Sequence, residues 1–175
     1  HTVFANLSPE VAAITITAHS PSKTFNLAGL AASSLIIPDE KLRNIVKSQI
    51  QHLHLDMGNI FGFEATKAAF NLGDEWLDEL IKYLKNNVME AKSFLQEKLP
   101  GMVIYPTEDT YLMWIEFAFA ELDDKAIHAK LISEAGLWLS PGKDFGAGGE
   151  NKMRLNVACP LSVLQVGLQK IAVTF

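Results

Sequence analysis

Apolar residues recur at three- and four-residue steps through much of this chain, with polar residues between them. This spacing is typical of helices with one buried face. The clearest case is residues 73–101, where the pattern ends at Pro100-Gly101. Helices are predicted over 38–53, 59–71, 73–101, 123–136 and 161–175.

Other segments are short, rich in β-branched and apolar residues, and bounded by Pro or Gly, which is typical of strands. Two of them, 11–19 and 30–38, lack polar alternation and are predicted to be buried strands. Four further strands are predicted over 102–106, 111–119, 137–142 and 153–159. Three tryptophans stand in apolar patterns and are expected in the core: Trp76, Trp114 and Trp138.

The order of elements after residue 40 indicates an α+β domain, with an antiparallel or mixed sheet covered by helices. The first 40 residues differ, because two buried strands with a turn between them have too few partners to form a sheet of their own. We therefore expect them to belong to a larger sheet whose other strands are absent.

Composition narrows the function classes. The chain has 175 residues, 49% hydrophobic and 20% charged, and a formal net charge of −5, so neither nucleic acid nor an anionic membrane is an expected partner. One cysteine excludes an intrachain disulfide and suggests a reducing, cytoplasmic location. The chain begins His-Thr-Val without Met or a signal-peptide pattern, so we expect the C-terminal part of a longer protein.

One lysine has unusual neighbours. In "HSPSKTFNLAGL", Lys23 follows Ser20-Pro21-Ser22 and precedes an apolar run. Either the amine serves chemistry, or Lys23 is a solvated lysine at a strand end. The two serines either close the turn or bind a phosphate. No histidine pair has the spacing of a metal site, so no metal is expected.

Four segments together resemble one family. They are "AHSPSKTFNLAGLAASSLIIPDEKLR", "NIFGFEATKAAFNLGDEWLDELIKYLKNN", "DTYLMWIEF" and "AGLWLSPGKDFGAGGENKMRLNVACP". In this order they resemble the fold-type I pyridoxal-phosphate enzymes of the aminotransferase class I/II superfamily. Within it, they are most similar to the MalY/PatB group of cystathionine β-lyase-like enzymes. The resemblance covers essentially the whole chain.

The resemblance implies a division of the chain and a set of site residues. Residues 1–40 would be a remnant of the large cofactor-binding domain, 41–72 linking helices, and 73–175 the C-terminal small domain. Lys23 would bind pyridoxal 5′-phosphate covalently, which requires a neutral amine and favours a buried lysine. Ser20 and Ser22 would contact the phosphate, and Arg154 would bind the carboxylate of an amino-acid substrate.

The resemblance leaves three functions open. The first is a C–S β-lyase that converts cystathionine or cysteine to pyruvate, ammonia and a thiol. The second is an aminotransferase, but many of these place an arginine eight residues after the lysine, where this chain has Ala31. The third is a MalY-like regulatory protein that acts through protein contacts. The intact protein would be a homodimer.

The family's other cofactor-binding residues lie upstream of the lysine. They include the aspartate that pairs with the pyridine nitrogen and a glycine-rich phosphate segment. The chain starts too close to Lys23 to contain them, so the isolated chain is expected to bind the cofactor poorly and to be inactive. The side chain of the substrate is not indicated by the residues.

Overall fold

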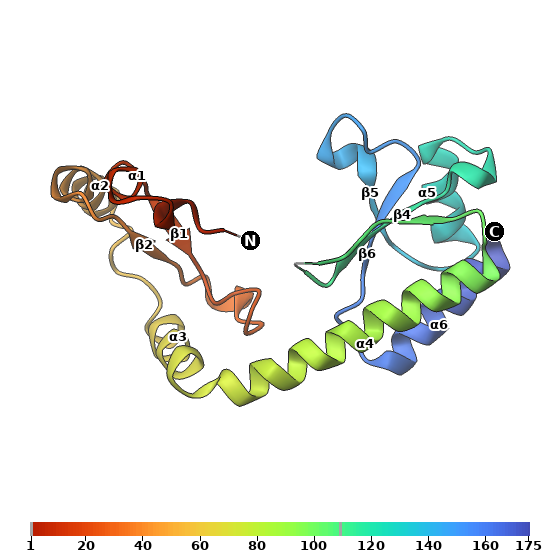
Figure 1. Cartoon of the computed structure of the whole chain (residues 1–175), viewed down its shortest axis with the longest axis horizontal. Helices are drawn as coiled ribbons and strands as arrows, with labels where there is room; N and C mark the ends of the chain where they lie inside the picture. The colour runs from red at the N-terminus through yellow and green to blue at the C-terminus, as the bar shows by residue number, and fades with distance from the viewer. Residues whose placement is uncertain (1, 109) are drawn as a thin grey trace. The chain divides into compact units, whose positions relative to one another are not determined.

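The computed structural model describes residues 2–108 and 110–175. It forms two compact units, one ending at Glu79 and the other running from Leu80 to Phe175. The boundary falls inside the long helix α4 (Asp74–Lys98), which is drawn in yellow-green in Figure 1. Each unit is described separately below.

The first unit contains short strands and helices. The strands β1 (Thr17–His19) and β2 (Ser34–Ile36) form a two-stranded antiparallel sheet in which Ala18 pairs with Leu35. The α-helices are α1 (Pro9–Ala13), α2 (Glu40–His52) and α3 (Ile60–Leu72). Two 3₁₀ turns lie at Phe4–Asn6 and Ala28–Leu30.

The predicted strand 11–19 is wrong over its first part, because residues 9–13 form helix α1. Ser8 caps this helix by accepting a hydrogen bond from Val11 N at 3.2 Å, and Pro9 occupies its first turn. A serine followed by proline and an acid is a helix-start signal. It outweighs the β preference of the following residues, and only Thr17–His19 pairs as a strand.

The predicted strand 30–38 is also shorter than expected, and its burial is wrong. Ser34, Leu35 and Ile36 are all exposed, since β2 has only β1 beside it and no layer over it within this unit. The two predicted helices are confirmed as α2 and α3. Asp39 caps α2 through Leu42 N at 2.7 Å, and Asn59 caps α3 through Phe61 N at 3.1 Å.

The second unit is a four-stranded antiparallel sheet with helices packed against it. The strand order is β3-β4-β6-β5, from β3 (Val103–Ile104), β4 (Leu112–Glu116), β6 (Lys152–Asn156) and β5 (Ser140–Pro141). The helices are the second part of α4, α5 (Asp124–Ser133) and α6 (Leu161–Thr174). Two 3₁₀ turns lie at Ala118–Ala120 and Gly142–Phe145.

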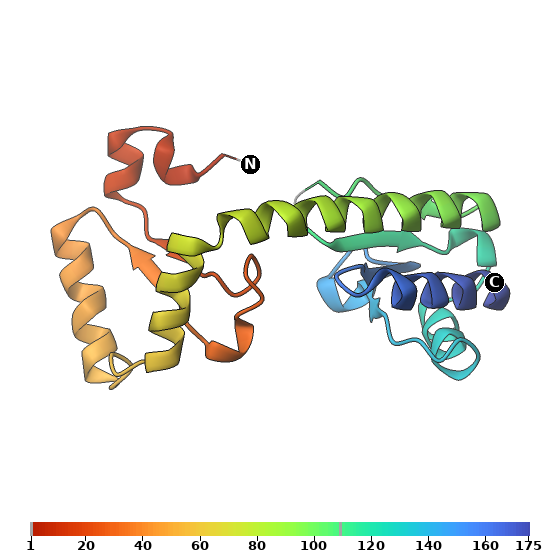
Figure 2. The same ribbon diagram turned by 90° about the horizontal axis from the view of Figure 1, so that it is seen from below.

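One face of this sheet forms the core. Met113, Ile115 and Met153 are fully buried and belong to one apolar cluster with Leu95 of α4 and Leu168 of α6. Helices α4 and α6 lie side by side in both views, and Gln165 of α6 donates to Glu90 of α4 at 3.1 Å (Figures 1 and 2). The expected α+β arrangement of an antiparallel sheet with helices against it is confirmed.

Asn87 ties α4 to the segment that joins β6 to α6. Its buried side-chain amide donates to the carbonyls of Val157 at 2.8 Å and Cys159 at 3.0 Å.

Among the described residues, no helix combines the length and the apolar composition that a membrane span requires.

Candidate functional site

Lys23 lies on a tight loop between β1 and the 3₁₀ turn Ala28–Leu30. Two backbone hydrogen bonds shape this loop, from Phe25 N to Pro21 O at 2.9 Å and from Leu27 N to Ser22 O at 3.0 Å. Pro21 is one of the few buried residues of the first unit. The loop therefore has a fixed backbone, although it contains no regular helix or strand.

The two serines of the loop are not equivalent. The Ser20 hydroxyl donates to Ala32 O at 2.8 Å and accepts from Ser22 N at 3.2 Å. A hydroxyl has one proton to donate, so Ser20 has none left for a phosphate. In the part of the chain that the structure describes, the Ser22 hydroxyl makes no hydrogen bond, and its proton is available.

Lys23 itself is exposed, which differs from the burial expected from its chemistry. Its ammonium forms no ion pair or hydrogen bond within the described residues. The first unit therefore holds the lysine backbone in place but leaves its amine free.

An aromatic cluster anchors the loop to the helices of the first unit. Phe25, two residues after the lysine, stacks on Trp76 at a centroid distance of 6.0 Å and meets Phe70 edge-on at 5.8 Å. His19, at the end of β1, also stacks on Phe70, with 5.4 Å between the ring centroids. A side chain at Gly73 would meet the Phe25 ring at 2.6 Å, so this glycine gives the ring its place.

Ala31, the position at which this chain departs from many aminotransferases, is exposed and has a left-handed φ of 50°. The backbone carbonyl groups of the residues before and after it both accept hydrogen bonds. Leu30 O accepts from Asn59 Nδ2 at 3.2 Å, and Ala32 O accepts from Ser20.

Arg154, the expected carboxylate-binding residue, lies in β6 of the second unit. Its register partners are Trp114 on β4 and Ser140 on β5. The guanidinium donates to Ser140 Oγ at 3.2 Å and lies over the Phe145 ring, with 4.6 Å between Cζ and the ring centroid. Phe145 in turn meets the Trp114 ring edge-on at 5.3 Å.

The cations around this site differ in their partners. Lys143 forms an ion pair with Asp124 at 2.7 Å, and Lys152 lies 3.8 Å from Glu116. Within the described residues no carboxylate comes within 4.0 Å of Arg154. The half-buried Arg154 is thus held in place by neutral groups and keeps its charge available for an anion.

A glycine-rich loop, residues 142–149, connects β5 to β6 beside Arg154. Gly142 and Gly149 lie back to back: a Cβ on Gly149 would stand 2.1 Å from Gly142 O, and one on Gly142 would stand 2.2 Å from Gly149 O. Gly146 and Gly148 have φ values of 108° and 85°, which favour glycine. These glycines therefore permit a closely packed backbone.

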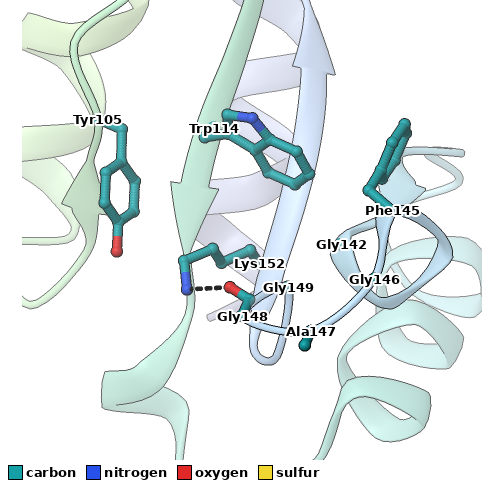
Figure 3. A pocket seen from close by; sticks show the side chains of 9 residues that line it. All are labelled: Tyr105, Trp114, Gly142, Phe145, Gly146, Ala147, Gly148, Gly149 and Lys152. Atoms are coloured by element: carbon teal, nitrogen blue, oxygen red, sulfur yellow. Dashed lines mark hydrogen bonds between the residues drawn. The ribbon is translucent and has the colours of Figure 1, made fainter.

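The loop and the exposed face of the sheet enclose a cavity of about 300 Å³. Figure 3 shows Trp114 and Lys152 reaching into it from the strands and Phe145 from the loop. Lys152 Nζ donates to Gly148 O at 2.7 Å (Figure 3). Arg154 lines a second cavity of about 380 Å³, together with Ser140, Asn156 and apolar side chains of α6.

Hydrogen bonds shift the pKa values of three groups near the loop: Asp124, Lys143 and Tyr105. The ammonium of Lys143 lowers the pKa of Asp124, whose second oxygen accepts from Asn151 N at 2.6 Å, and burial opposes this shift. The same pair raises the pKa of Lys143. The hydrogen bond from Tyr105 to Glu116, at 2.6 Å, raises the pKa of Tyr105.

The sequence did not single out three residues of this region: Trp114, Asp124 and Phe145. The prediction that the three tryptophans lie in the core is wrong: Trp114 is half-buried and lines a cavity, and Trp76 and Trp138 are exposed, Trp138 to 81%. An apolar pattern does not distinguish a core residue from one that lines a cavity. Asp123 caps α5 by accepting a hydrogen bond from Ala126 N at 2.8 Å, and the local sequence does not distinguish Asp124 from it.

Comparisons with known proteins agree with these features. The family model described as aminotransferase class I and II matches residues 1–171. Cystathionine β-lyase PatB of Bacillus subtilis (strain 168) is 42% identical over 171 residues, 98% of this chain and 44% of that protein. Protein MalY of Escherichia coli (strain K12) is 30% identical over 150 residues, 85% of this chain and 38% of that protein.

The fold has relatives among solved structures. Cystalysin from Treponema denticola, whose crystal structure contains a pyridoxal 5′-phosphate cofactor, matches with a TM-score of 0.91 and 33% identity. The match covers 99% of this chain and 44% of that one. This chain spans less than half the length of these relatives, and it belongs to the aminotransferase class I and II family.

Proposed function

We propose that the full-length protein is a pyridoxal-phosphate-dependent C–S β-lyase that acts on an amino acid with a sulfur at Cβ, such as cystathionine. The observation that carries this proposal is the Ser20-Pro21-Ser22-Lys23 loop. Its backbone is fixed by internal hydrogen bonds and by the Phe25 cluster, while the Lys23 amine and the Ser22 hydroxyl are left free. The similarity to cystathionine β-lyase PatB supports the choice of reaction.

Two groups of this loop fit the cofactor. The Lys23 amine can bind its aldehyde, and the Ser22 hydroxyl can donate to its phosphate, whereas the Ser20 hydroxyl holds the loop closed. When bound, the cofactor supplies an electron sink for negative charge at the substrate Cα. The group that pairs with the pyridine nitrogen is proposed to lie in the part of the relatives that this chain does not span.

Arg154 is proposed to bind the substrate carboxylate. Its guanidinium has five N–H donors, and Ser140 accepts only one hydrogen bond from it. The ring of Phe145 covers one face and leaves the edge for a planar, bidentate contact. Fixing the carboxylate also fixes Cα, to which it is bonded.

The proposed reaction balances with water as the only co-reactant. Lys23, once the substrate amine has taken its place, accepts the proton from Cα. The Cβ–S bond then breaks, and the sulfur leaves with the bond's electron pair and is protonated to the thiol. Water hydrolyses the remaining unsaturated amine to pyruvate and ammonia.

The remaining expectations about the whole protein are also proposals. Residues 1–40 would complete a larger cofactor-binding domain, residues 41–72 would link it to the small domain 73–175, and the protein would act as a cytoplasmic homodimer. The isolated chain would bind the cofactor poorly and would be inactive. A stable cofactor absorbance band formed by this chain alone, and abolished by Lys23→Ala, would contradict the poor binding.

The test uses the full-length protein loaded with pyridoxal phosphate and given cystathionine without any oxo acid. We expect pyruvate and thiol in equal amounts. Lys23→Ala should lower the rate at least about 100-fold, since it removes the general base. Lys41→Ala, which changes an exposed lysine of α2, should leave the rate unchanged. Turnover that appears only after an oxo acid is added would instead identify an aminotransferase.

A further inference from the structure

Asp124 is a buried acid that the proposed reaction does not use. It stands in the first turn of α5, next to the helix cap Asp123, and only 6% of it is exposed. Its two oxygens bind opposite ends of the glycine-rich loop. Lys143 Nζ lies 2.7 Å from one, and Asn151 N donates to the other at 2.6 Å.

The residues that Asp124 contacts are connected to Arg154 through the loop. Lys143 belongs to the 3₁₀ turn Gly142–Phe145. The last residue of this turn is Phe145, whose ring lies over the Arg154 guanidinium. Asn151 stands at the other end of the loop, just before β6. Because Gly142 and Gly149 pack back to back, the loop between them cannot shift at one end alone.

We propose that Asp124 is a positioning residue for carboxylate binding: it fixes the glycine-rich loop so that Phe145 holds the Arg154 guanidinium in place. This inference rests on the proposed role of Arg154. It assigns a function to the loop and to the second of two adjacent aspartates, Asp123-Asp124, which otherwise look interchangeable in sequence.

The negative charge of Asp124 lets an experiment distinguish a charge effect from a positioning effect, because the two change carboxylate affinity in opposite directions. Neutralising an acid near a carboxylate site removes a repulsion, so a simple charge effect would make carboxylate binding tighter. Loss of positioning would make it weaker. Asp124→Asn and Asp123→Asn carry the same charge change, and asparagine also caps helices well, so Asp123→Asn is the matched control.

The experiment measures the binding of propionate and of propanamide, its uncharged counterpart, to the full-length cofactor-loaded protein by ligand-observed NMR. We expect Asp124→Asn to raise the dissociation constant of propionate about three- to tenfold, which is the range of a cation–π contact in a partly desolvated site. Propanamide binding should stay unchanged. Asp123→Asn should leave propionate binding equal or slightly tighter.

Two further variants keep the test decisive if Asp124→Asn folds poorly. Phe145→Leu changes an exposed residue and should weaken propionate binding to a similar extent. In an Arg154→Gln background, neither Asp124→Asn nor Phe145→Leu should have a further effect, since the two would act only through the arginine. Amide hydrogen exchange over 142–152 should be faster in Asp124→Asn than in Asp123→Asn.

The outcomes separate the two proposals. If Arg154→Gln abolishes propionate binding but Asp124→Asn and Phe145→Leu leave it unchanged, the positioning role is wrong and the carboxylate site stands. If Arg154→Gln itself has no effect, or propionate does not bind the wild-type protein, the assignment of Arg154 is wrong and the positioning role fails with it. Equal weakening of propionate and propanamide would indicate general damage and would also overturn the proposal.

Discussion

The two units of this chain differ in how they are stabilised. In the second unit, strands and helices bury a continuous cluster in which Ile115 and Phe117 have no exposed surface. In the first unit, the buried residues are Pro21, Ile37 and Gly62, while β2 is exposed throughout. Arg154 is therefore built on a complete core, whereas Lys23 depends on a loop with local support.

This difference suggests why the two residues are held in different ways. Arg154 is positioned by neighbouring strands and by a braced loop, all within one unit. Lys23 is positioned by hydrogen bonds between neighbouring residues of its own loop and by one aromatic cluster. We infer that the first unit needs further packing partners, which would also bury the lysine.

The largest expected effect comes from comparing the two units directly. Phe117→Ala should lower the free energy of unfolding of this chain by about 3–5 kcal/mol, since it leaves a cavity in the core. Ile36→Ala, at a position that is 56% exposed, should change it by about 0.5 kcal/mol or less. Urea unfolding followed by circular dichroism measures both. Similar losses from both substitutions would remove the distinction between the units.

The glycines provide the next test. Gly149→Ala places a methyl group against the Gly142 backbone and should cost about 1–3 kcal/mol. Gly29→Ala is the control in the first unit, where nothing lies within 4 Å of the new methyl group, and it should be near neutral. The same urea experiment applies. A neutral Gly149→Ala would show that the loop is not braced in the way described.

The two serines give a smaller effect with a clear contrast. Ser20→Ala should destabilise the lysine loop by about 0.5–1.5 kcal/mol, because it removes a hydrogen bond to Ala32 and one from Ser22. Ser22→Ala should leave hydrogen exchange of this loop unchanged but weaken cofactor binding in the full-length protein. Faster exchange in Ser22→Ala than in Ser20→Ala would reverse the assignment of the two hydroxyls.

The smallest effect concerns pH. Because its pKa is lowered in the folded chain, Asp124 contributes stability that is fully present above its unfolded pKa of about 3.9. That contribution is lost as the pH falls through the lower folded value. It should not exceed about 1 kcal/mol, since Lys143 is largely solvated. The difference in unfolding free energy between wild type and Asp124→Asn should therefore shrink in acid, and a difference that grows there would contradict the pairing.

The fold was predictable where the signal is local. The spacing of apolar residues predicted α2, α3, α4, α5 and α6, because the residues that form one face of a helix all lie within one continuous segment of the sequence. Strand lengths were overestimated, since pairing partners decide where a strand ends, and β2 has only one. Helix α1 differs from the predicted strand, because the Ser8-Pro9 start signal outweighs the apolar run that follows it.

The candidate site stays a prediction, and it rests on the resemblance to a family rather than on the residues alone. The pattern around Lys23 left two interpretations open, and nothing in it distinguished Ser20 from Ser22, since their difference comes from the carbonyl of Ala32 across the loop. Asp124 was not predictable, because its partners Lys143 and Asn151 lie far along the chain. Phe145 has no distinguishing signal in the sequence, because its contact with the Arg154 guanidinium exists only in the folded chain.

The central claim is that Lys23 carries the cofactor in the full-length protein. The most direct test reduces the cofactor-loaded protein with borohydride, which makes the attachment permanent, and then maps the peptides by mass spectrometry. The claim predicts a pyridoxyl group on Lys23, within the peptide that contains Ser20-Pro21-Ser22. A pyridoxyl group on another lysine, or on none, would contradict it.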